Sequence, residues 1–377
     1  MSCDLVYFIK FIDRHIYLKK ILLNFSMYKN KTLILALLLP LQILLIKLLS
    51  SSPSSIETYY SKGVYPIISK SLRFIFGWLP FSVGDILYAI LIIYILKWGY
   101  SNFKSIYRRP KQTLLTITAF LSVIYFCFHF LWGLNYYRNP LHKTLNIDNE
   151  YSTEELIQIT KKLITTTNVI HLKIAKNDNT KVIVPYSNSE IFEKTKLGYK
   201  GLEKIHPNLK YQQKSIKNSL WSLPLTYAGY SGYLNPFTNE AQVNSLIPKY
   251  HFPLVSCHEE AHQIGYAAEN ETNFIGYLAC MKNPDDYFQY AGATFAVRYC
   301  LNELYRRDSK SYEELIKTLN TGVRKNFQES QQFWNSYQNP TEIVFKSVYD
   351  IFLKSNNQQK GIKSYSYVVA LIVNYEQ

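Results

Sequence analysis

The residues with the clearest capacity for chemistry are His258, Glu259 and His262, which stand in the sequence HEEAH. Residues four apart share one face of a helix, so both imidazoles can bind one metal ion while Glu259 lies beside an open coordination position. A metal ion held in this way polarises a bound water, and a neighbouring carboxylate takes the proton of that water. The motif therefore predicts a zinc centre for amide hydrolysis, with His258 and His262 as ligands and Glu259 as the catalytic base. Other divalent metals also accept these ligand types.

A hydrolytic zinc centre needs a third protein ligand and an exchangeable water. Gly265 can adopt a left-handed conformation and end the helix, which lets the chain fold back so that a residue about seven positions after His262 reaches the metal. Glu269 stands at this offset, and we predict it as the third ligand, with Glu271 as the alternative. Residues two apart do not share a helix face, so only one of the two can bind the ion. Asn273 shares a face with Glu269 and is predicted to hold a ligand in place.

A segment rich in glycine, proline and tyrosine, residues 230–244, precedes this motif. It suits short strands and turns, and it either lines a cleft that binds an extended substrate backbone or packs as a structural turn against the active helix. Amide hydrolysis also needs a hydrogen-bond donor outside the metal shell. Tyr230, Tyr233 and His251 are the candidate substrate-binding residues. Because the chain has 33 tyrosines, packing is the simpler interpretation for each tyrosine taken alone.

Mostly helical elements must position these residues. After Leu141 no stretch is long and apolar enough to cross a membrane, and helical patterns predominate. Ser152 and Glu155 match a capping box that opens a helix ending near Ala175. Further helices are expected over residues 190–205, 254–264, 269–281 and 285–305, with short strands within 221–243 and three or four more helices near the carboxyl end.

Three apolar stretches precede residue 140, at residues 32–49, 83–100 and 114–134. Each approaches the about 20 apolar residues that cross a bilayer as a helix, so we predict three transmembrane helices in residues 1–139. A cleavable signal peptide is the alternative for the first stretch, but no small-residue cleavage site follows it closely and two more spans do. Asp85 and His129 are ionisable residues of the later stretches, and contacts between helices are a simpler interpretation for them than a proton path. Met1 and Met27 both stay open as the start of the chain.

The connecting segments predict the orientation of these helices. Lysine and arginine are frequent before the first stretch and between the second and third, so both segments should be cytoplasmic. The loop between the first and second stretches is longer and less basic. We therefore predict a multi-pass protein of the cytoplasmic (inner) membrane, with residues 140–377 as an extracytoplasmic domain.

Composition excludes several other classes of protein. The net charge of +15 consists of +12 in residues 1–139 and +3 in the remainder, so the basic excess reflects membrane topology and argues against nucleic-acid binding. A hydrophobic content of 47% with 18% charged residues excludes a disordered or fibrous chain. The five cysteines form no CxxC pair, which argues against a disulfide scaffold, and we expect Cys257, Cys280 and Cys300 to be buried as small apolar residues.

The sequence HEEAHQIGYAAENETNF resembles the zincin metallopeptidases. Its ExExN ending is similar to the glutamate-containing second helix of membrane-bound gluzincins such as the CAAX prenyl protease and related heat-shock membrane proteases. In those families a glutamate supplies the third metal ligand, and an aspartate four residues later supports a histidine. The resemblance implies these roles for Glu269 and Asn273, with asparagine in place of aspartate and with a much shorter gap between the two helices.

Over nearly its full length the chain resembles a bacterial membrane-protein family, domain of unknown function 3810. The resemblance rests on the three amino-terminal spans, the WGLNYYR sequence at 132–138, the GYLNPFTNE sequence at 232–240 and the HExxH region through Cys280. It implies a mainly α fold, with three transmembrane helices followed by a mostly helical, zincin-like soluble domain that contains a small strand and turn segment.

These features together predict a membrane-anchored zinc metallopeptidase that hydrolyses a protein, peptide or cell-wall peptide outside the cytoplasmic membrane. The alternative is a catalytically degenerate zincin that acts as a metal-containing binding or scaffold protein of the cell envelope. The intact Glu259 argues against it, because a binding module needs no general base. A scaffold with purely structural histidines would bind no zinc. An intramembrane protease is disfavoured, because the polar residues 258–273 would be costly in lipid. The sequence leaves the substrate and the oligomeric state open.

Overall fold

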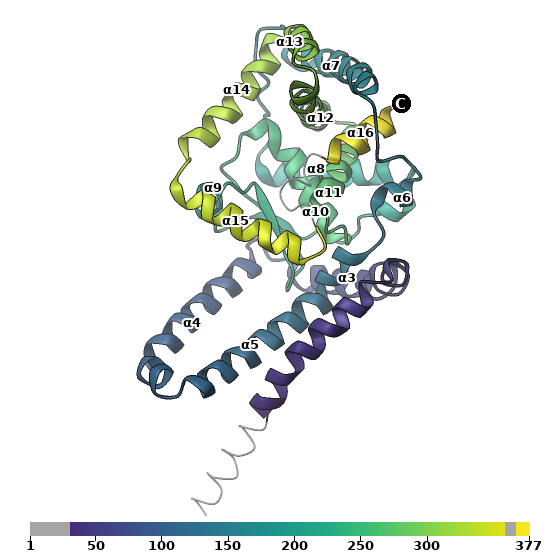
Figure 1. Ribbon diagram of the computed structural model, residues 1–377. Helices are drawn as coiled ribbons and strands as arrows, with labels where there is room; N and C mark the ends of the chain where they lie inside the picture. Colours follow the sequence, from purple (N-terminus) through teal and green to yellow (C-terminus); the bar gives the residue numbers. More distant parts are fainter. Residues whose placement is uncertain (1–30, 359–366) are drawn as a thin grey trace, which may run out of the picture. The chain divides into compact units, whose positions relative to one another are not determined.

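The computed structural model describes residues 31–358 and 367–377, and most of them are helical (Figure 1). It confirms the prediction of a mainly α chain with three long apolar helices in its first third and few strands. The chain forms two compact units, one of Met1–Ser51 with Leu91–Phe130 and the other of Ser52–Ile90 with Leu131–Gln377. The division into a membrane region of residues 1–139 and a soluble domain of residues 140–377 rests on a different criterion, the contact with lipid or water, and it stays a prediction. Met1, Met27 and the basic residues from Lys10 to Lys29 lie outside the described residues.

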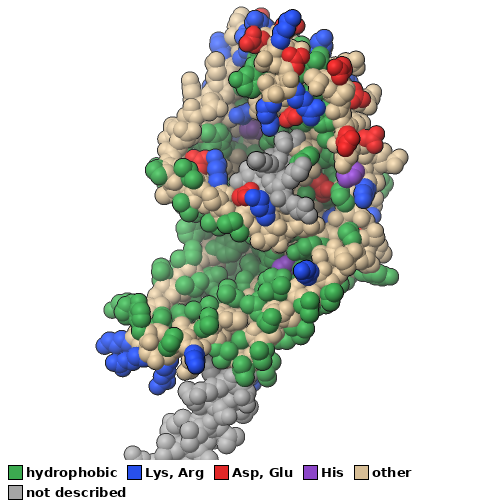
Figure 2. All heavy atoms as spheres, viewed as in Figure 1, with side chains coloured by type: hydrophobic (Ala, Val, Ile, Leu, Met, Phe, Trp, Pro, Cys, Tyr) green, Lys and Arg blue, Asp and Glu red, His purple; other side chains and the backbone are tan. Residues whose placement is uncertain are grey.

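The first unit contains the apolar helices. They are a helix over Lys31–Leu49, the part of α4 (Val83–Arg108) after Ile90, and α5 (Pro110–Leu131) up to Phe130. In the described part of the chain, these three helices are the ones long and apolar enough to cross a membrane. Figure 2 shows hydrophobic side chains along them and a cluster of basic side chains where α4 turns into α5.

Two of these helices differ from their predicted bounds. α4 continues eight residues beyond Tyr100, because nothing before Pro110 interrupts a helix. α5 ends at Leu131 instead of residue 134, and the chain continues into a short 3-10 helix, η2 (Gly133–Tyr137). The early end agrees with the low helix propensity of glycine.

The segment that connects the first two spans is helical. It contains α2 (Pro53–Ser55), the π-helix η1 (Ile56–Val64) and α3 (Tyr65–Phe76). Pro66 lies in the first turn of α3, where a missing N–H costs no intrahelical hydrogen bond. Tyr65 and Ser69 of α3 are buried in the interior of the second unit.

The remainder of the second unit is a set of helices near their predicted positions. A capping box of Ser152 and Glu155 opens α7, as predicted, and a second capping box opens α8. The helices are α6 (Leu141–Leu145), α7 (Thr153–Ala175), α8 (Asn188–Glu203), α9 (Ser222–Tyr227), α10 (Phe252–Gln263), α11 (Glu269–Met281), α12 (Asp286–Arg307), α13 (Ser309–Thr318), α14 (Thr321–Ser336), α15 (Pro340–Ser355) and α16 (Val368–Glu376), with short 3-10 helices η3 (Pro207–Leu209) and η4 (Lys249–His251).

The core of this unit forms around α10 and α11, which pack against each other and against α8 and α12. Phe252 of α10 and Phe274 of α11 are fully buried, and burial of such a side chain contributes about 1.5–3 kcal/mol. Cys257, Cys280 and Cys300 are buried and free, as predicted. The helices that carry the candidate ligands are therefore the most enclosed part of the unit.

Three short strands form one sheet in the order β1-β3-β2. β1 (Ile216–Asn218) runs parallel to β3 (Glu240–Val243), and β2 (Gly232–Asn235) runs antiparallel to β3. The predicted strand segment 221–243 thus contains β2 and β3, but it begins with a short helix, α9, that the prediction omits. Pro224 in the first turn of α9 is compatible with helix. β2 lies at the edge of the sheet.

The sheet is joined to the first turn of α4 by a buried ion pair. The Glu240 carboxylate accepts hydrogen bonds from the backbone N–H of Val83 (3.2 Å) and Gly84 (2.6 Å), and the Lys217 ammonium pairs with it. A carboxylate at this position satisfies N–H groups that no helical carbonyl reaches and interacts favourably with the helix dipole. The Asp85 carboxylate accepts hydrogen bonds from the Ser219 hydroxyl and the Leu220 backbone N–H, just after β1, so these contacts of Asp85 are structural.

Removing the charge of Glu240 should destabilise the second unit. Glu240→Gln leaves the Lys217 ammonium buried without its counter-charge, which costs about 3–5 kcal/mol. We expect a lower apparent melting temperature of the full chain in detergent, followed by tryptophan fluorescence. The double variant with Lys217→Met should recover much of the loss, and Lys173→Met, which breaks the exposed pair with Asp286, should cost less than about 1 kcal/mol. A melting temperature equal to that of the wild-type chain would contradict the assigned role of the pair.

Candidate metal centre

A tight turn between α10 and α11 brings the two halves of the candidate site together. α10 ends at Gln263, and Gly265 has a φ of +91°, which L side chains rarely adopt. A Cβ at this glycine would lie 2.9 Å from the Tyr65 ring, so glycine is required for space as well as for conformation. The chain reverses as predicted, and α11 begins at Glu269.

This reversal places His258, His262 and Glu269 around one point. Their ligand atoms all lie within 4.8 Å of one another. Glu269 Oε2 is 3.4 Å from His258 Nε2, and Glu269 Oε1 is 3.7 Å from His262 Nε2. The two imidazole rings are nearly perpendicular, with centroids 4.9 Å apart. The side chains are almost enclosed, which removes competing water.

The geometry of this cluster fits a zinc ion. Tetrahedral zinc with bonds of about 2.0–2.1 Å separates its ligand atoms by about 3.3 Å, close to the two distances from Glu269. The Nδ1 atom of His262 lies 2.8 Å from the carbonyl oxygen of Tyr266 and donates to it, which leaves the Nε2 lone pair directed at the cluster. Two imidazole nitrogens and one carboxylate form the donor set of many hydrolytic zinc sites.

The pKa values follow from this enclosure. Burial disfavours the charged imidazole of His258, but a hydrogen bond with Glu269 and the charges of Glu259 and Glu269 outweigh it, so its pKa is raised. Burial lowers the pKa of His262 to about 4. Burial raises the pKa of Glu269, but the hydrogen bond with His258 and the two imidazoles reverse this effect and lower that pKa to about 2. Glu269 is therefore an anion near neutral pH.

Glu259 lies beside the cluster in a different environment. Its side chain is 3% exposed, and burial raises its pKa to about 8. Within the described residues, its Oε2 atom has no hydrogen-bond partner. Gly232 of β2 lies against it, and a Cβ there would be 2.6 Å from Glu259 Oε1. A carboxyl group with a raised pKa near neutrality is suited to taking up and releasing a proton.

Glu271, the alternative third ligand, points away from the cluster. Its Oε1 atom accepts a hydrogen bond of 2.6 Å from the backbone N–H of Leu141, and burial raises its pKa to about 7. The structure thus brings Glu269, and not Glu271, to the two histidines, in agreement with the argument from helix faces. Asn273 lies next to His258 and contributes to the raised pKa of that imidazole by a hydrogen bond.

The candidate substrate-binding residues lie at different distances from the cluster. Tyr230 lies close to Glu269. Burial is the main cause of the raised pKa of the Tyr230 phenol, and the charge of Glu269 is the second. The Tyr233 hydroxyl donates to Asp85, so it serves the sheet. His251 stands seven residues before His258, about 10 Å along α10, and stacks on Tyr250. The structure therefore does not bring His251 to the metal ligands.

Tyr349 of α15, which no sequence pattern indicates, touches a candidate ligand directly. Its hydroxyl donates a hydrogen bond of 2.6 Å to Glu269 Oε1, and its ring packs edge-on against Tyr230 with centroids 5.3 Å apart. Because 80 residues separate Tyr349 from Glu269, no local spacing connects them. α15 thus crosses the candidate centre and orients its carboxylate.

Two side chains that no sequence pattern indicates donate hydrogen bonds to backbone carbonyl oxygens at the carboxyl end of α10 and in the turn after it. Trp132, one residue beyond α5, donates its indole N–H to the carbonyl oxygen of His262 at 3.3 Å. The Arg138 guanidinium donates to the carbonyl oxygen of Gly265 at 2.9 Å and pairs with Glu57 at 3.2 Å. These bonds hold the turn between the two ligand-bearing helices.

Helix α3 supplies the remaining donors at this end. The hydroxyls of Tyr65 and Ser69 both lie 3.0 Å from the carbonyl oxygen of Gln263. The Gln263 amide in turn donates to the carbonyl oxygen of Asn239, next to β3. The position of α10 therefore depends on both α3 and the sheet.

Comparisons with known proteins identify the family of this chain. It is a mainly helical protein with three candidate membrane spans and a buried cluster of two histidines and one glutamate. The family described as Protein of unknown function (DUF3810) matches residues 60–373, and the chain belongs to it. This match confirms the family resemblance seen in the sequence. No curated protein and no solved structure matches the chain, and the resemblance to zincins stays a prediction.

Removing the Tyr349 hydroxyl should weaken metal binding. Tyr349→Phe removes the donor that orients Glu269, and loss of such a partner lowers metal affinity about 10–100-fold. Competition with a chromophoric zinc chelator on the full chain in detergent measures the change. Tyr305→Phe is the control, since Tyr305 is exposed on α12. Equal affinities in both variants and in the wild-type chain would show that the hydroxyl does not position the ligand.

Proposed function

We propose that this protein is a membrane-anchored, zinc-dependent peptidase. The observation that carries the proposal is the convergence of His258, His262 and Glu269 within 4.8 Å beside the buried carboxyl of Glu259. Burial of His262, Glu269 and an unpaired carboxyl oxygen of Glu259 is costly for stability alone. The arrangement is therefore better explained by chemistry than by packing.

Each residue of the centre has a defined task in this reaction. Zinc, when bound to His258, His262 and Glu269, supplies a Lewis acid that polarises a water and a substrate carbonyl. Glu259 takes a proton from the attacking water and passes it to the leaving amine. Tyr349 and the carbonyl oxygen of Tyr266 keep Glu269 and His262 in orientation.

The edge strand β2 supports an extended polypeptide as substrate. In the described part of the chain, β3 is the strand that pairs with β2, so the other edge of β2 has no strand partner and is the edge we assign to strand addition. Gly232 of β2 lies against Glu259, which brings a backbone bound along β2 next to the catalytic carboxyl. Of the two predicted roles for residues 230–244, this geometry favours the cleft.

The charge distribution supports a catalytic unit outside the cytoplasm. The turn between α4 and α5 is rich in basic residues, namely Lys104, Arg108, Arg109 and Lys111, and such loops stay on the cytoplasmic side. Membrane crossings by α4 and α5 then place the second unit on the opposite side of the inner membrane. A protein, peptide or cell-wall peptide of the envelope is the corresponding substrate.

Metal analysis tests the centre. We expect about one zinc per full-length chain by mass spectrometry, because three ligands converge. His262→Ala and Glu269→Ala should abolish binding. Glu271→Gln should retain the zinc, since Glu271 faces Leu141. A folded wild-type chain that binds no metal would overturn the proposal, and zinc retained in Glu269→Ala but lost in Glu271→Gln would reverse the assignment of the third ligand.

Activity tests the role of Glu259. Glu259→Gln keeps the shape of the side chain and removes the base, so cleavage of fluorescently labelled casein should fall at least about 100-fold while zinc content stays unchanged. Glu313→Gln, on α13, is the control. If zinc is bound but neither the wild-type chain nor the control cleaves casein or a cell-wall peptide, the alternative of a metal-containing binding or scaffold protein of the envelope replaces the peptidase.

A further inference from the structure

Helix α15 has two faces of opposite character. Its inner face carries Tyr349, which bonds to Glu269, and Leu353, which is fully buried. Its outer face carries Val344, Val348 and Ile351, which are 62%, 60% and 64% exposed. Positions i, i+4 and i+7 lie along one side of a helix, so these side chains form a continuous apolar stripe. Figure 2 shows hydrophobic side chains gathered along α15.

The end of α15 lies beside the chain segment that follows a candidate membrane span. The ring of Phe352 packs edge-on against Tyr136, with centroids 6.0 Å apart. The amide of Asn357 donates to the carbonyl oxygen of Tyr136 at 3.2 Å. Tyr136 follows Leu131, the last residue of α5, by five positions. α15 is thus tied to a point close to where the chain leaves the bilayer.

Helix α3 exposes a second apolar face in the same unit. Tyr65 and Ser69 on its inner side hold α10, whereas Ile67 and Phe74 on the opposite side are 70% and 71% exposed. Only six residues separate α3 from the start of α4, a reach of at most about 20 Å. This helix therefore stays close to the membrane surface, whatever its tilt.

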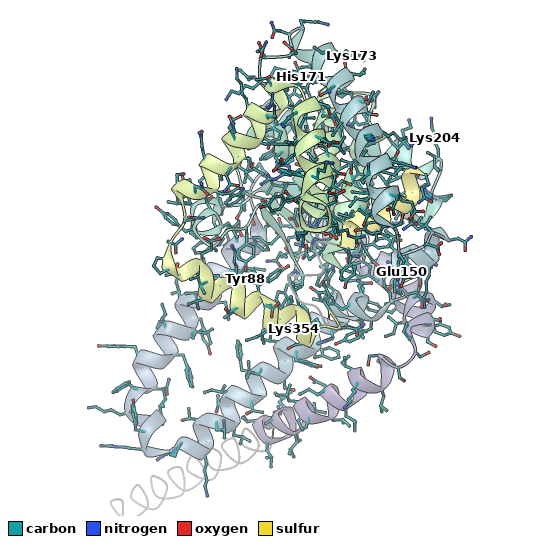
Figure 3. All side chains as sticks on the ribbon, turned by 45° about the horizontal axis from the view of Figure 1, so that its top comes forward. Tyr88, Glu150, His171, Lys173, Lys204 and Lys354 are labelled. Carbon is teal, nitrogen blue, oxygen red and sulfur yellow. The ribbon has the colours of Figure 1, made fainter. Side chains whose placement is uncertain are left out.

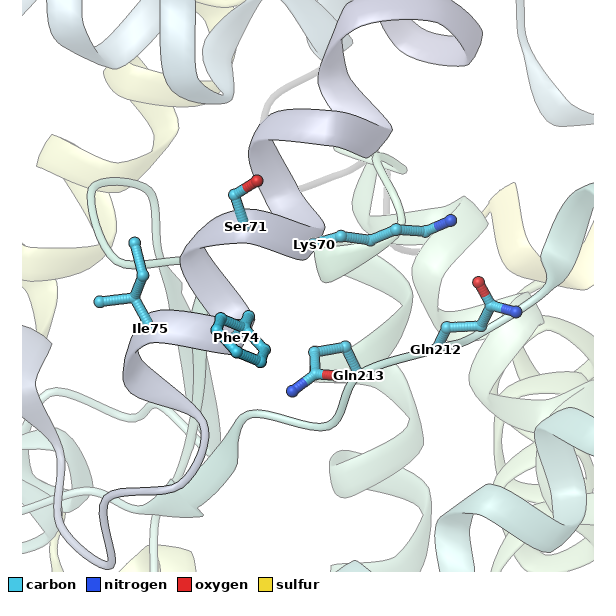
Figure 4. Close-up of a pocket in the computed structure, with 6 residues that line it drawn as sticks. All are labelled: Lys70, Ser71, Phe74, Ile75, Gln212 and Gln213. Carbon is cyan, nitrogen blue, oxygen red and sulfur yellow. The ribbon is translucent and has the colours of Figure 1, made fainter.

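An open pocket of about 730 Å³ lies on the outer side of α3 (Figure 4). Phe74 and Ile75 give it apolar walls, and Lys70 brings an ammonium to it. An apolar wall next to a cation suits a lipid acyl chain with its anionic phosphate. None of the candidate metal ligands lines this pocket.

Helices α3 and α15 both lie toward the end of the second unit that contains the first turns of α4. In Figure 1, α15 and α3 lie along the same edge as the first turns of α4. In Figure 3, Lys354 of α15 and Tyr88 of α4 lie toward one end, whereas His171 and Lys173 of α7 lie toward the other. Lys354 lies beside the apolar stripe of α15 and pairs with Asp350 at 2.6 Å, and its side chain, which is 52% exposed, is long enough to reach the lipid phosphates.

We propose that the outer faces of α3 and α15 lie in the interfacial layer of the lipid bilayer, and that the candidate centre opens at the membrane surface onto polypeptides tethered to that membrane. Amphipathic helices of this kind bury their apolar face about 5–10 Å into the boundary between headgroups and acyl chains. The lipid contact is independent of the proposed peptidase activity. The substrate class rests on that activity.

The lipid contact is tested with a fluorophore on each face. Full-length protein with Cys3→Ser and Cys127→Ser receives one of Val348→Cys, Phe74→Cys or Ile183→Cys, is labelled with the dye NBD, and enters nanodiscs of phosphatidylethanolamine and phosphatidylglycerol. Cys257, Cys280 and Cys300 are buried and stay unlabelled. Ile183 is the matched control, since it is 71% exposed and lies between α7 and α8, next to Val182, which bonds to Asn326 of α14.

Spin-labelled lipid should lower the emission about twofold or more at positions 348 and 74, because a face within the headgroup boundary lies among the quenchers. Emission at position 183 should not change. Absence of quenching at position 348 would overturn the proposal, even with quenching at position 74. Emission at 348 that depends on the number of chains per disc instead of on spin-labelled lipid would assign the stripe to a second copy of the chain and would also overturn it. His262→Ala should leave the quenching unchanged, so a failed peptidase and a failed lipid contact give different results.

The substrate class is tested with one peptide in two forms. A casein peptide that the nanodisc-bound protein cleaves is compared with the same peptide carrying a palmitoyl chain. Tethering raises the effective concentration at the membrane, so kcat/KM should rise about tenfold or more. Val348→Asp should reduce this advantage and leave cleavage of the free peptide unchanged. Equal rates for both forms in the wild-type chain would overturn the proposed substrate class while leaving the peptidase itself intact.

Discussion

The carbonyl end of α10 is the constraint on which the candidate centre depends. A helix leaves its last carbonyl oxygens without intrahelical donors, and in a buried helix these groups need partners from elsewhere. Here the partners come from α3 and from the segment after α5, so that His262 and the turn at Gly265 are held by chain that adjoins the membrane. The geometry of the candidate centre therefore depends on the segments that adjoin the candidate membrane spans. Displacing the donors would move the turn, and with it the angle between the two ligand-bearing helices.

Local sequence signals predict the elements of this fold well where they act over a few residues. The capping box at Ser152 and the long apolar runs are signals of this kind, and the structure contains the corresponding helices. The sequence does not predict the helices between Pro53 and Phe76, in which side chains such as those of Tyr65 and Ser69 contact α10. Their burial against α10 decides the conformation, and contacts across nearly 200 residues leave no local pattern. Helix α9 is missed for a similar reason, since turn-forming residues surround it.

The residues of the candidate site also fall into two groups, those that local spacing predicts and those that only tertiary packing brings to the centre. Helical periodicity places His258 and His262 on one face, and the offset after Gly265 selects Glu269 over Glu271, because both arguments concern residues within one helix–turn–helix. Tyr349, Trp132 and Gly232 reach the centre through tertiary packing, so spacing alone cannot identify them. The composition of the chain adds a further difficulty. Tyrosine is so frequent that its presence near the motif carries little information, and only coordinates distinguish Tyr230 from Tyr233.

The ion pair of Glu240 with Lys217 has a consequence for the order in which this protein matures. Glu240 stands 156 residues after Gly84, whose N–H it accepts. The ribosome therefore completes α4, α5 and much of the second unit before the acceptor for the first turn of α4 exists. Until then, water or lipid headgroups must satisfy those N–H groups, which requires the beginning of this span to stay at the membrane surface. Contact of Glu240 with the first turn of α4 is thus a late event in synthesis, and closure over so long a loop is slow. A nascent chain stalled before residue 240 would carry its spans but lack the anchor that sets where the second one begins.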